Sequence, residues 1–269
     1  MTENSSNHSL SELLRSAEAE DLSVLVDYLT DKGEGRVSLT TATCSQLVAA
    51  KARGVYSEND LDTIVKELCR FGGNSFMNAL RGGVGVPYRE VVSDVLEHLK
   101  GSADSSDSVE LLELKILQRL ASQAWERMGP AEQKEFASNF GSGDLVGPAA
   151  LAAVLASIRL GGFASYQIAV ILAHSMAKLL LGRGLTFATS AALTRTIGVI
   201  AGPIGWLFTA IWTLFDLASP AYRVTVPCVI HIAYMRQKKS VQTCGSCDSV
   251  NALGAKFCNE CGARFPKAA

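Results

Sequence analysis

Residues 109–128 read VELLELKILQRLASQAWERM, and this stretch decides the fold class of the chain. Its apolar residues recur three or four positions apart, which places them on one face of a helix of about five turns. Polar and charged residues occupy the other face, so the stretch predicts an amphipathic helix that buries one side. The apolar positions include Leu112, Ile116, Leu117, Leu120 and Trp125.

Helical spacing continues on both sides of this stretch. Ser57-Glu-Asn-Asp60, for example, has the pattern of a capping box before a run of apolar residues spaced by threes and fours. Residues 1–239 contain no run with the two-residue alternation of a strand. We therefore predict a mainly α protein with a multi-helix, bundle-like body. Further helices are expected near residues 10–29, 37–52, 57–71, 75–80, 87–99, 130–140 and 222–239.

Composition narrows the class of protein. The chain has 269 residues, of which 48% are hydrophobic and 19% charged, and this is too apolar for a disordered protein. Residues 1–144 carry 14 basic and 23 acidic side chains, a net charge of −9, whereas residues 145–269 carry 11 and 3, a net charge of +8. The acidic half is not expected to bind nucleic acid. The basic, apolar half suits anionic lipid, nucleic acid or the acidic half itself.

Four cysteines near the C-terminus form the strongest motif, C-x2-C-x10-C-x2-C. Each C-x-x-C turn can direct two thiolates at one ion, and two turns complete a tetrahedral S4 site that suits Zn²⁺. Four protein ligands leave no open position, so we expect structural rather than catalytic zinc. Metal binding would supply the folding energy of so small a module, with Phe257 and Phe265 covering one side of the turns. The predicted metal ligands are Cys244, Cys247, Cys258 and Cys261.

Two other uses of these cysteines are less favourable. The N-terminus lacks the charged start and apolar core of a signal peptide, which favours a cytoplasmic protein with reduced thiols over one with disulfides. A redox C-x-x-C is disfavoured because no βαβ pattern surrounds either pair. We expect four segments in the chain: a loose N-terminus 1–8, an acidic helical region 9–144, an apolar basic helical region 145–239 and a zinc ribbon 240–269.

The apolar region leaves two interpretations open. Leu160–Ala177 and Thr196–Phe215 lack Asp, Glu, Lys and Arg, and each approaches the length that crosses a bilayer. Residues 160–215 could therefore form a membrane hairpin, flanked by basic residues that suit anionic headgroups. Alternatively, the glycines and proline in the middle of the second segment divide it into two short helices of a soluble core.

No recognised catalytic motif emerges from the sequence. Ser175-Met-Ala-Lys178 has the S-x-x-K spacing of penicillin-recognising enzymes, but no K-T-G or S-D-N partner accompanies it. The chain has no P-loop, no H-E-x-x-H and no G-x-S-x-G. Its four histidines are far apart in sequence, which favours separate surface or core roles. They are His8, His98, His174 and His231.

Two stretches resemble the YaaW-like family of uncharacterised bacterial proteins, which is grouped distantly with the ubiquinol–cytochrome c chaperones. They are Glu67–Lys100, with Phe71-Gly-Gly-Asn-Ser75, Leu80-Arg-Gly82 and Tyr88-Arg89, and Ala218–Arg236, with Ala221-Tyr-Arg-Val-Thr225. The resemblance covers residues 10–239 and implies a mostly helical body with no established activity and no catalytic residues. In addition to the resemblance, the residues themselves suggest that Arg81, Arg89 and Arg223 pair with acidic residues of the N-terminal half.

These observations together predict a non-enzymatic interaction protein or chaperone-like adaptor with a structural zinc ribbon. The expected partner is a protein; neither nucleic acid nor a small-molecule substrate is inferred. The expected location is the cytoplasm, with association with the inner membrane as an extension. The alternative is a membrane-associated or membrane-inserting protein with an apolar helical hairpin.

Overall fold

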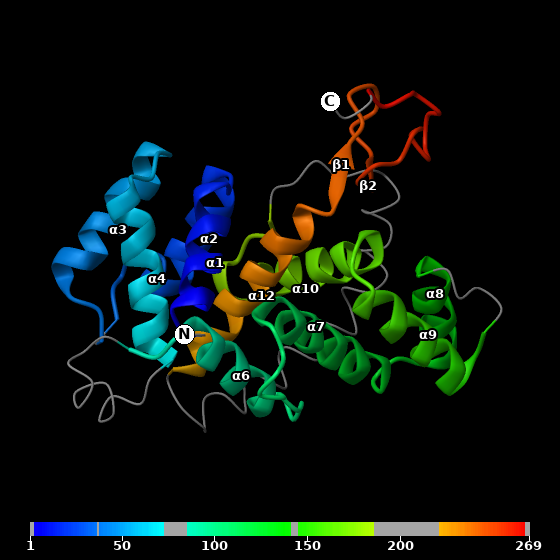
Figure 1. The fold of residues 1–269 in the computed structure, drawn as a ribbon, viewed down its shortest axis with the longest axis horizontal. Coiled ribbons are helices and arrows are strands. Elements are labelled where there is room, and N and C mark those ends of the chain that lie inside the picture. The colour runs from blue at the N-terminus through cyan, green and yellow to red at the C-terminus, as the bar shows by residue number, and fades with distance from the viewer. Residues whose placement is uncertain (1–2, 37, 73–84, 141–144, 186–220, 267–269) are drawn as a thin grey trace. The chain divides into compact units, whose positions relative to one another are not determined.

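The computed structural model describes residues 3–36, 38–72, 85–140, 145–185 and 221–266. Within these residues the chain is mainly α-helical and ends in a small ribbon, which confirms the predicted fold class (Figure 1). The helices are α1 (Glu3–Arg15), α2 (Ala19–Thr30), α3 (Thr41–Arg53), α4 (Glu58–Gly72), α6 (Tyr88–His98), α7 (Val109–Trp125), α8 (Pro130–Asn139), α9 (Gly147–Arg159), α10 (Phe163–Leu181) and α12 (Tyr222–Lys238). The strands are β1 (Val241–Thr243) and β2 (Val250–Ala252).

The chain divides into two compact units, and each unit is built from two separate stretches of sequence. One unit contains Met1–Ile116 and Ile211–Met235, and the other contains Leu117–Ala210 and Arg236–Ala269. The boundary predicted between residues 144 and 145 adjoins residues 141–144, which lie outside the described residues, and the four predicted segments stay a prediction.

In the first unit, α1 packs against α4 and α6, and α2 packs against α3 and α4 (Figure 1). Helix α1 begins at Glu3, inside the segment predicted to be loose. The reason is a set of contacts with residues far along the chain. The side chain of Asn7 accepts a hydrogen bond of 2.8 Å from the backbone N–H of Tyr88, and Leu10 is fully buried. These contacts offset the entropy lost when the terminus is ordered.

Local sequence explains where several helices begin and end. Thr40 precedes α3, and its hydroxyl accepts a hydrogen bond from the backbone N–H of Thr43, as an N-cap residue does. The predicted capping box before α4 is present. Ser57 N–H donates to the Asp60 carboxylate at 2.9 Å, and Asp60 N–H donates to the Ser57 hydroxyl at 3.3 Å. Both bonds satisfy backbone donors that the first turn of a helix cannot satisfy itself.

The core of the first unit contains polar side chains with defined partners. The hydroxyl of fully buried Tyr88 donates to the carboxylate of fully buried Glu113 at 3.0 Å. His231 on α12 is also fully buried, and its Nε2 lies 3.0 Å from the backbone oxygen of Asp21. Hydrogen bonding of this kind removes most of the cost of burying polar groups.

In the second unit, α9 packs against both α8 and α10. The turn between α9 and α10 uses Gly161 and Gly162, whose φ angles of 76° and 80° lie in the left-handed region that favours glycine. The predicted apolar segment Leu160–Ala177 is therefore divided. Its first three residues lie in and next to this turn, and the remainder belongs to α10. The other predicted segment, Thr196–Phe215, lies outside the described residues.

Among the described residues, α10 is the one helix whose length and apolar composition would allow it to cross a membrane. Within its most apolar window, 61% of the residues are buried inside the structure. Its buried Ser165 hydroxyl donates to the Gln237 side chain at 2.5 Å. The core helix of a globular protein has the same features, so α10 by itself is weak evidence for a membrane span.

Candidate metal centre

The C-terminal ribbon is built on a short antiparallel hairpin. Strand β1 pairs with β2 in the register Val241–Ala252, Gln242–Asn251 and Thr243–Val250. The first C-x-x-C turn, which we call knuckle 1 (residues 244–249), connects the two strands. A second turn, knuckle 2 (residues 258–263), is flanked by an antiparallel bridge between Phe257 and Arg264. Each knuckle is thus held at both ends by main-chain pairing.

In knuckle 1, the main chain wraps around the first cysteine. Cys244 N–H donates to the oxygen of Ser249 at 2.8 Å, and Asp248 N–H donates to the oxygen of Cys244 at 2.9 Å. The N–H of Ser246 lies 3.4 Å from the Cys244 sulfur and donates to it. Asp248 adopts the left-handed conformation, with φ of 56°, which the tight turn requires.

Knuckle 2 repeats the same bonds at the equivalent positions. Cys258 N–H donates to Ala263 oxygen at 2.8 Å, Gly262 N–H donates to Cys258 oxygen at 3.0 Å, and Glu260 N–H donates to Cys258 sulfur at 3.4 Å. Gly262 has φ of 72°, matching the left-handed residue of knuckle 1. The two knuckles are therefore two copies of one turn, and each turn directs backbone N–H groups at its first sulfur.

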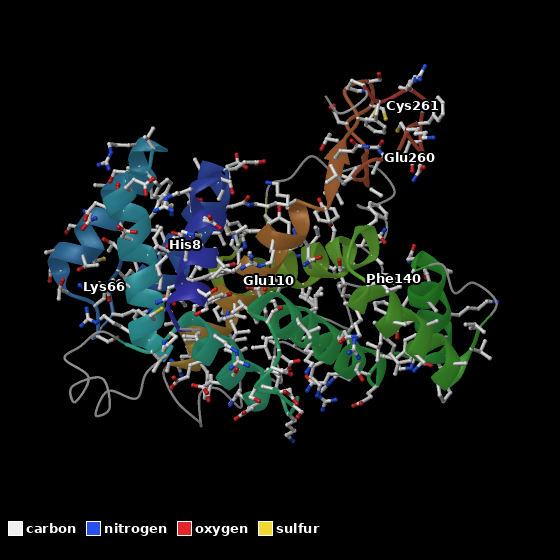
Figure 2. All side chains as sticks on the ribbon, viewed as in Figure 1. His8, Lys66, Glu110, Phe140, Glu260 and Cys261 are labelled. Atoms are coloured by element: carbon white, nitrogen blue, oxygen red, sulfur yellow. The ribbon has the colours of Figure 1, made fainter. Side chains whose placement is uncertain are left out.

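The four sulfur atoms lie within 4.8 Å of one another (Figure 2). The Cys244 and Cys261 sulfurs are 3.7 Å apart, and so are those of Cys247 and Cys258. A zinc–sulfur bond of about 2.3 Å gives a tetrahedron whose edge is about 3.8 Å. Both separations match that edge, and both greatly exceed the length of about 2.05 Å found in a disulfide. The donor set and its spacing thus fit a tetrahedral metal ion.

Polar rather than aromatic side chains fill the space beside the sulfurs. Of the two aromatic residues predicted to cover the knuckles, Phe257 is 57% exposed and Phe265 is half-buried, so Phe257 gives at most partial cover. Ser249 and Asn251 are buried there instead, at 2% and 0% exposure. Hydrogen bonding with the Ser249 hydroxyl lowers the pKa of Cys258 to about 5, and it also lowers the pKa of Cys247. The pKa of Cys261 rises to about 12 instead, because the Ala263 N–H that lowers it is outweighed by hydrogen bonds with the other cysteine thiols and by burial. A lowered pKa favours the thiolate that binds a metal.

The other candidate residues remain separate. Among the described residues, the cysteine cluster is the one group of three or more His, Cys, Asp or Glu side chains close enough to hold a metal ion. Ser175 is buried on α10 without a hydrogen-bond partner for its hydroxyl in the described part of the chain, while Lys178 is exposed. Each histidine has its own neighbours: His8 lies near Glu12, His98 stacks on Tyr222, His174 packs on Gly184 and His231 contacts Asp21.

Tyr88-Arg89, which carries part of the family resemblance, has a structural role. Arg89, predicted to pair with acidic residues, instead donates to the backbone oxygens of Asp104, Ser105 and Asp107 at 2.8–3.2 Å. Its guanidinium thereby holds the loop before α7, because a planar group with five donors can serve several carbonyls at once. This loop borders a cavity of about 610 Å³ lined mainly by serine residues.

Comparisons with known proteins agree with the resemblance read from the sequence. The profile of the ubiquinol-cytochrome C chaperone family matches residues 59–230, so the cysteine cluster lies outside the matched region. A UPF0174 protein of Helicobacter pylori is 35% identical over 230 residues, which cover 84% of this chain and 90% of that protein. The UPF0174 protein YaaW of Escherichia coli is 27% identical over 246 residues, covering 89% and 98%. No solved structure matches the chain. The chain therefore belongs to the ubiquinol-cytochrome C chaperone family and is a relative of the UPF0174 proteins.

Proposed function

We propose that this protein is a non-enzymatic, chaperone-like adaptor that binds a protein partner and carries a structural zinc ribbon at its C-terminus. Family membership supports the chaperone-like role, since the matching family is described as ubiquinol-cytochrome C chaperones. The proposed location is the cytoplasm. The observation that carries the proposal is a set of exposed apolar side chains on the α9–α10 hairpin.

These side chains are large and project into solvent. Val146 is 71% exposed and Leu160 is 88% exposed, and both lie at the ends of α9. Leu145 and Leu179 are exposed by 43% and 41%. Helix α9 buries one stripe, Ala150, Val154 and Ile158, so its core contacts do not require the three exposed residues at its ends. The fourth exposed residue, Leu179, lies on α10. Val146 and Leu160 lie about 20 Å apart, at opposite ends of α9, so we propose that an extended partner segment contacts both.

The net charge supports the same assignment. Residues 145–269 carry a net charge of +8, so the apolar side chains of this hairpin lie in a basic part of the sequence. Binding through apolar contacts, with basic residues to attract acidic segments, requires no catalytic group. We therefore propose that the partner is an unfolded or partly folded protein segment with apolar and acidic residues.

The surface can be tested by placing charges on it. We expect the wild-type protein to suppress light scattering by a client protein that aggregates on heating. We expect Val146→Asp combined with Leu160→Asp to lose most of this suppression, because the introduced carboxylates remove the apolar contact. Val55→Asp is the matched control, since Val55 is 67% exposed in the other unit. Equal suppression by the double variant would show that the hairpin is not the surface, and no suppression by the wild type would refute the chaperone-like role.

The structural zinc ion is tested separately. Replacing Cys258 and Cys261 together by serine should abolish zinc binding, because two ligands cannot hold a structural zinc ion and the ribbon has no core of its own. The measurement is the zinc content of the purified full-length chain by mass spectrometry. We expect one zinc ion per wild-type chain and none in the double variant. Unchanged zinc content in that variant would refute the assignment of Cys258 and Cys261 as zinc ligands.

Insertion in a membrane is the alternative function, and the length and composition of α10 support it. The burial of most of that helix favours the core. Fractionation of cells that express the full chain, followed by a carbonate wash of the membrane pellet, separates the two. We expect the protein in the soluble fraction. Retention in the washed membrane would instead favour the membrane hairpin predicted for residues 160–215.

A further inference from the structure

Ser249 connects the two knuckles through their sulfur atoms. Its hydroxyl oxygen lies 3.1 Å from the sulfur of Cys247 in knuckle 1 and 2.9 Å from the sulfur of Cys258 in knuckle 2. The residue is 2% exposed, so water does not compete for these contacts. A hydroxyl has one hydrogen to donate and two lone pairs, and here both sulfurs lie within its reach.

Asn251 fixes the orientation of that hydroxyl. Its Nδ2 donates to the backbone oxygen of Ser249 at 3.0 Å and lies 3.2 Å from the Ser249 hydroxyl oxygen. Its Oδ1 accepts a hydrogen bond of 2.8 Å from the N–H of Asn259 in knuckle 2. With a lone pair of the hydroxyl engaged by Asn251, the hydrogen of that hydroxyl is left to point at sulfur. Fully buried Asn251 therefore ties β2, Ser249 and knuckle 2 together.

The repeat between the knuckles separates this role from simple folding. Ser249 occupies the position that Ala263 occupies in knuckle 2, and both residues accept the same bond from a cysteine N–H. Since knuckle 2 forms its turn with alanine at this position, the turn itself does not need a hydroxyl. The hydroxyl of Ser249 therefore has a role beyond the main-chain pattern. Its polar neighbours are the two sulfurs and Asn251, which indicates a role at the sulfur cluster.

We propose that Ser249, oriented by Asn251, is a positioning residue of the metal centre that holds the sulfurs of Cys247 and Cys258 in the arrangement that retains zinc. This inference rests on the proposed zinc site. A hydrogen bond to a ligating sulfur fixes the direction of its lone pairs, as outer hydrogen bonds do at other metal sites, where their loss costs 10–100-fold in affinity. The hydroxyl has one hydrogen, so it donates to the sulfur of either Cys247 or Cys258 at a given time, and it lies within reach of one sulfur of each knuckle. Its loss should therefore weaken the connection between the two knuckles.

The test is zinc competition between the full-length chain and a chromophoric chelator at constant pH. We expect Ser249→Ala to bind one zinc ion with a dissociation constant about 10–100-fold higher than that of the wild type. Ser246→Ala is the matched control, since this exposed serine of knuckle 1 meets sulfur only through its backbone N–H, and we expect less than a twofold change. Ser249→Thr keeps a hydroxyl, and we expect it to stay within about threefold of the wild type.

The cobalt(II) spectrum gives a second readout, because thiolate-to-cobalt charge-transfer absorption reports whether a tetrahedral sulfur site has assembled. We expect Ser249→Ala to reach the wild-type spectrum at saturating cobalt. A dissociation constant of Ser249→Ala within twofold of the wild type would overturn the inference. So would an equal loss in Ser249→Ala and Ser249→Thr, because the hydroxyl would then not be the cause. Failure of the wild type itself to bind zinc would refute the proposed metal site instead.

Discussion

Asp94 should make the stability of the first unit depend on pH. The residue lies half-buried on α6, with Glu90 one turn before it and Glu97 one turn after it. Burial and, after it, repulsion by these two carboxylates raise the pKa of Asp94 from 3.8 to about 6. Folding at neutral pH thus places a charge where the structure disfavours one, and replacement of Asp94 by asparagine should relieve it.

Proton linkage gives the sign and size of the effect of Asp94 on the free energy of unfolding. Between pH 3.8 and about 6 the folded protein binds more protons at Asp94 than the unfolded chain does, so stability falls as pH rises through this window. The difference in proton affinity sets an upper limit of about 3 kcal/mol above pH 6. Water screens a half-exposed carboxylate, which reduces the expected penalty to about 1 kcal/mol.

The assay is urea unfolding of Asp94→Asn and the wild type, followed by far-UV circular dichroism at pH 7.5 and pH 4.5. We expect the variant to be more stable by about 1 kcal/mol at pH 7.5 and by clearly less at pH 4.5, because Asp94 of the folded wild type is then largely neutral. Asp62→Asn, on the exposed face of α4, serves as the control for replacing an exposed carboxylate. An advantage of equal size at both pH values would refute the reasoning.

Two further pairs of substitutions test residues that adopt the left-handed conformation. Gly85→Ala should destabilise the chain by about 3 kcal/mol, because φ is 79° and a Cβ would lie 2.6 Å from the main chain of Cys69. Gly54→Ala has similar φ but open space around it and should cost only about 1 kcal/mol in the same urea assay. In the ribbon, Asp248→Gly should leave one zinc ion per chain, since glycine adopts its left-handed φ freely. Gly262→Val should lower the zinc content, because a β-branched residue strongly resists that conformation.

Much of the helical body could be predicted from short-range sequence. Helix α7 begins at Val109 and α8 at Pro130, as the spacing and the proline predict. The capping box of Ser57 and Asp60 involves residues three apart, so the sequence contains both partners of the interaction. The ordered start of α1 could not be predicted in this way, because Asn7 meets Tyr88, 81 residues further along the chain.

The candidate metal centre also has a part that the sequence predicts and a part that it does not. The spacing of the cysteines predicts the cluster of four sulfurs that the structure brings together, since each knuckle is a local turn. The buried pair Ser249 and Asn251 was missed, although a signal existed. Aligning knuckle 1 with knuckle 2 places Ser249 opposite Ala263 and shows that one copy has gained a hydroxyl. Asn251 gives no such signal, because its partner Asn259 is brought near by the closing of the two knuckles.

The proposed partner surface shows why composition alone cannot assign a function to this apolar region. Ile158 and Leu160 lie on either side of Arg159, yet Leu160 is 88% exposed and Ile158 is fully buried. The difference arises because α9 ends between them and Gly161 turns the chain. Apolar residues of this region therefore occur both in the core and on the surface. Charged substitutions at the exposed positions test partner binding without disturbing the core. Suppose that the double variant Val146→Asp with Leu160→Asp loses client binding and still holds one zinc ion per chain. The loss would then come from the α9–α10 hairpin and not from damage to the ribbon.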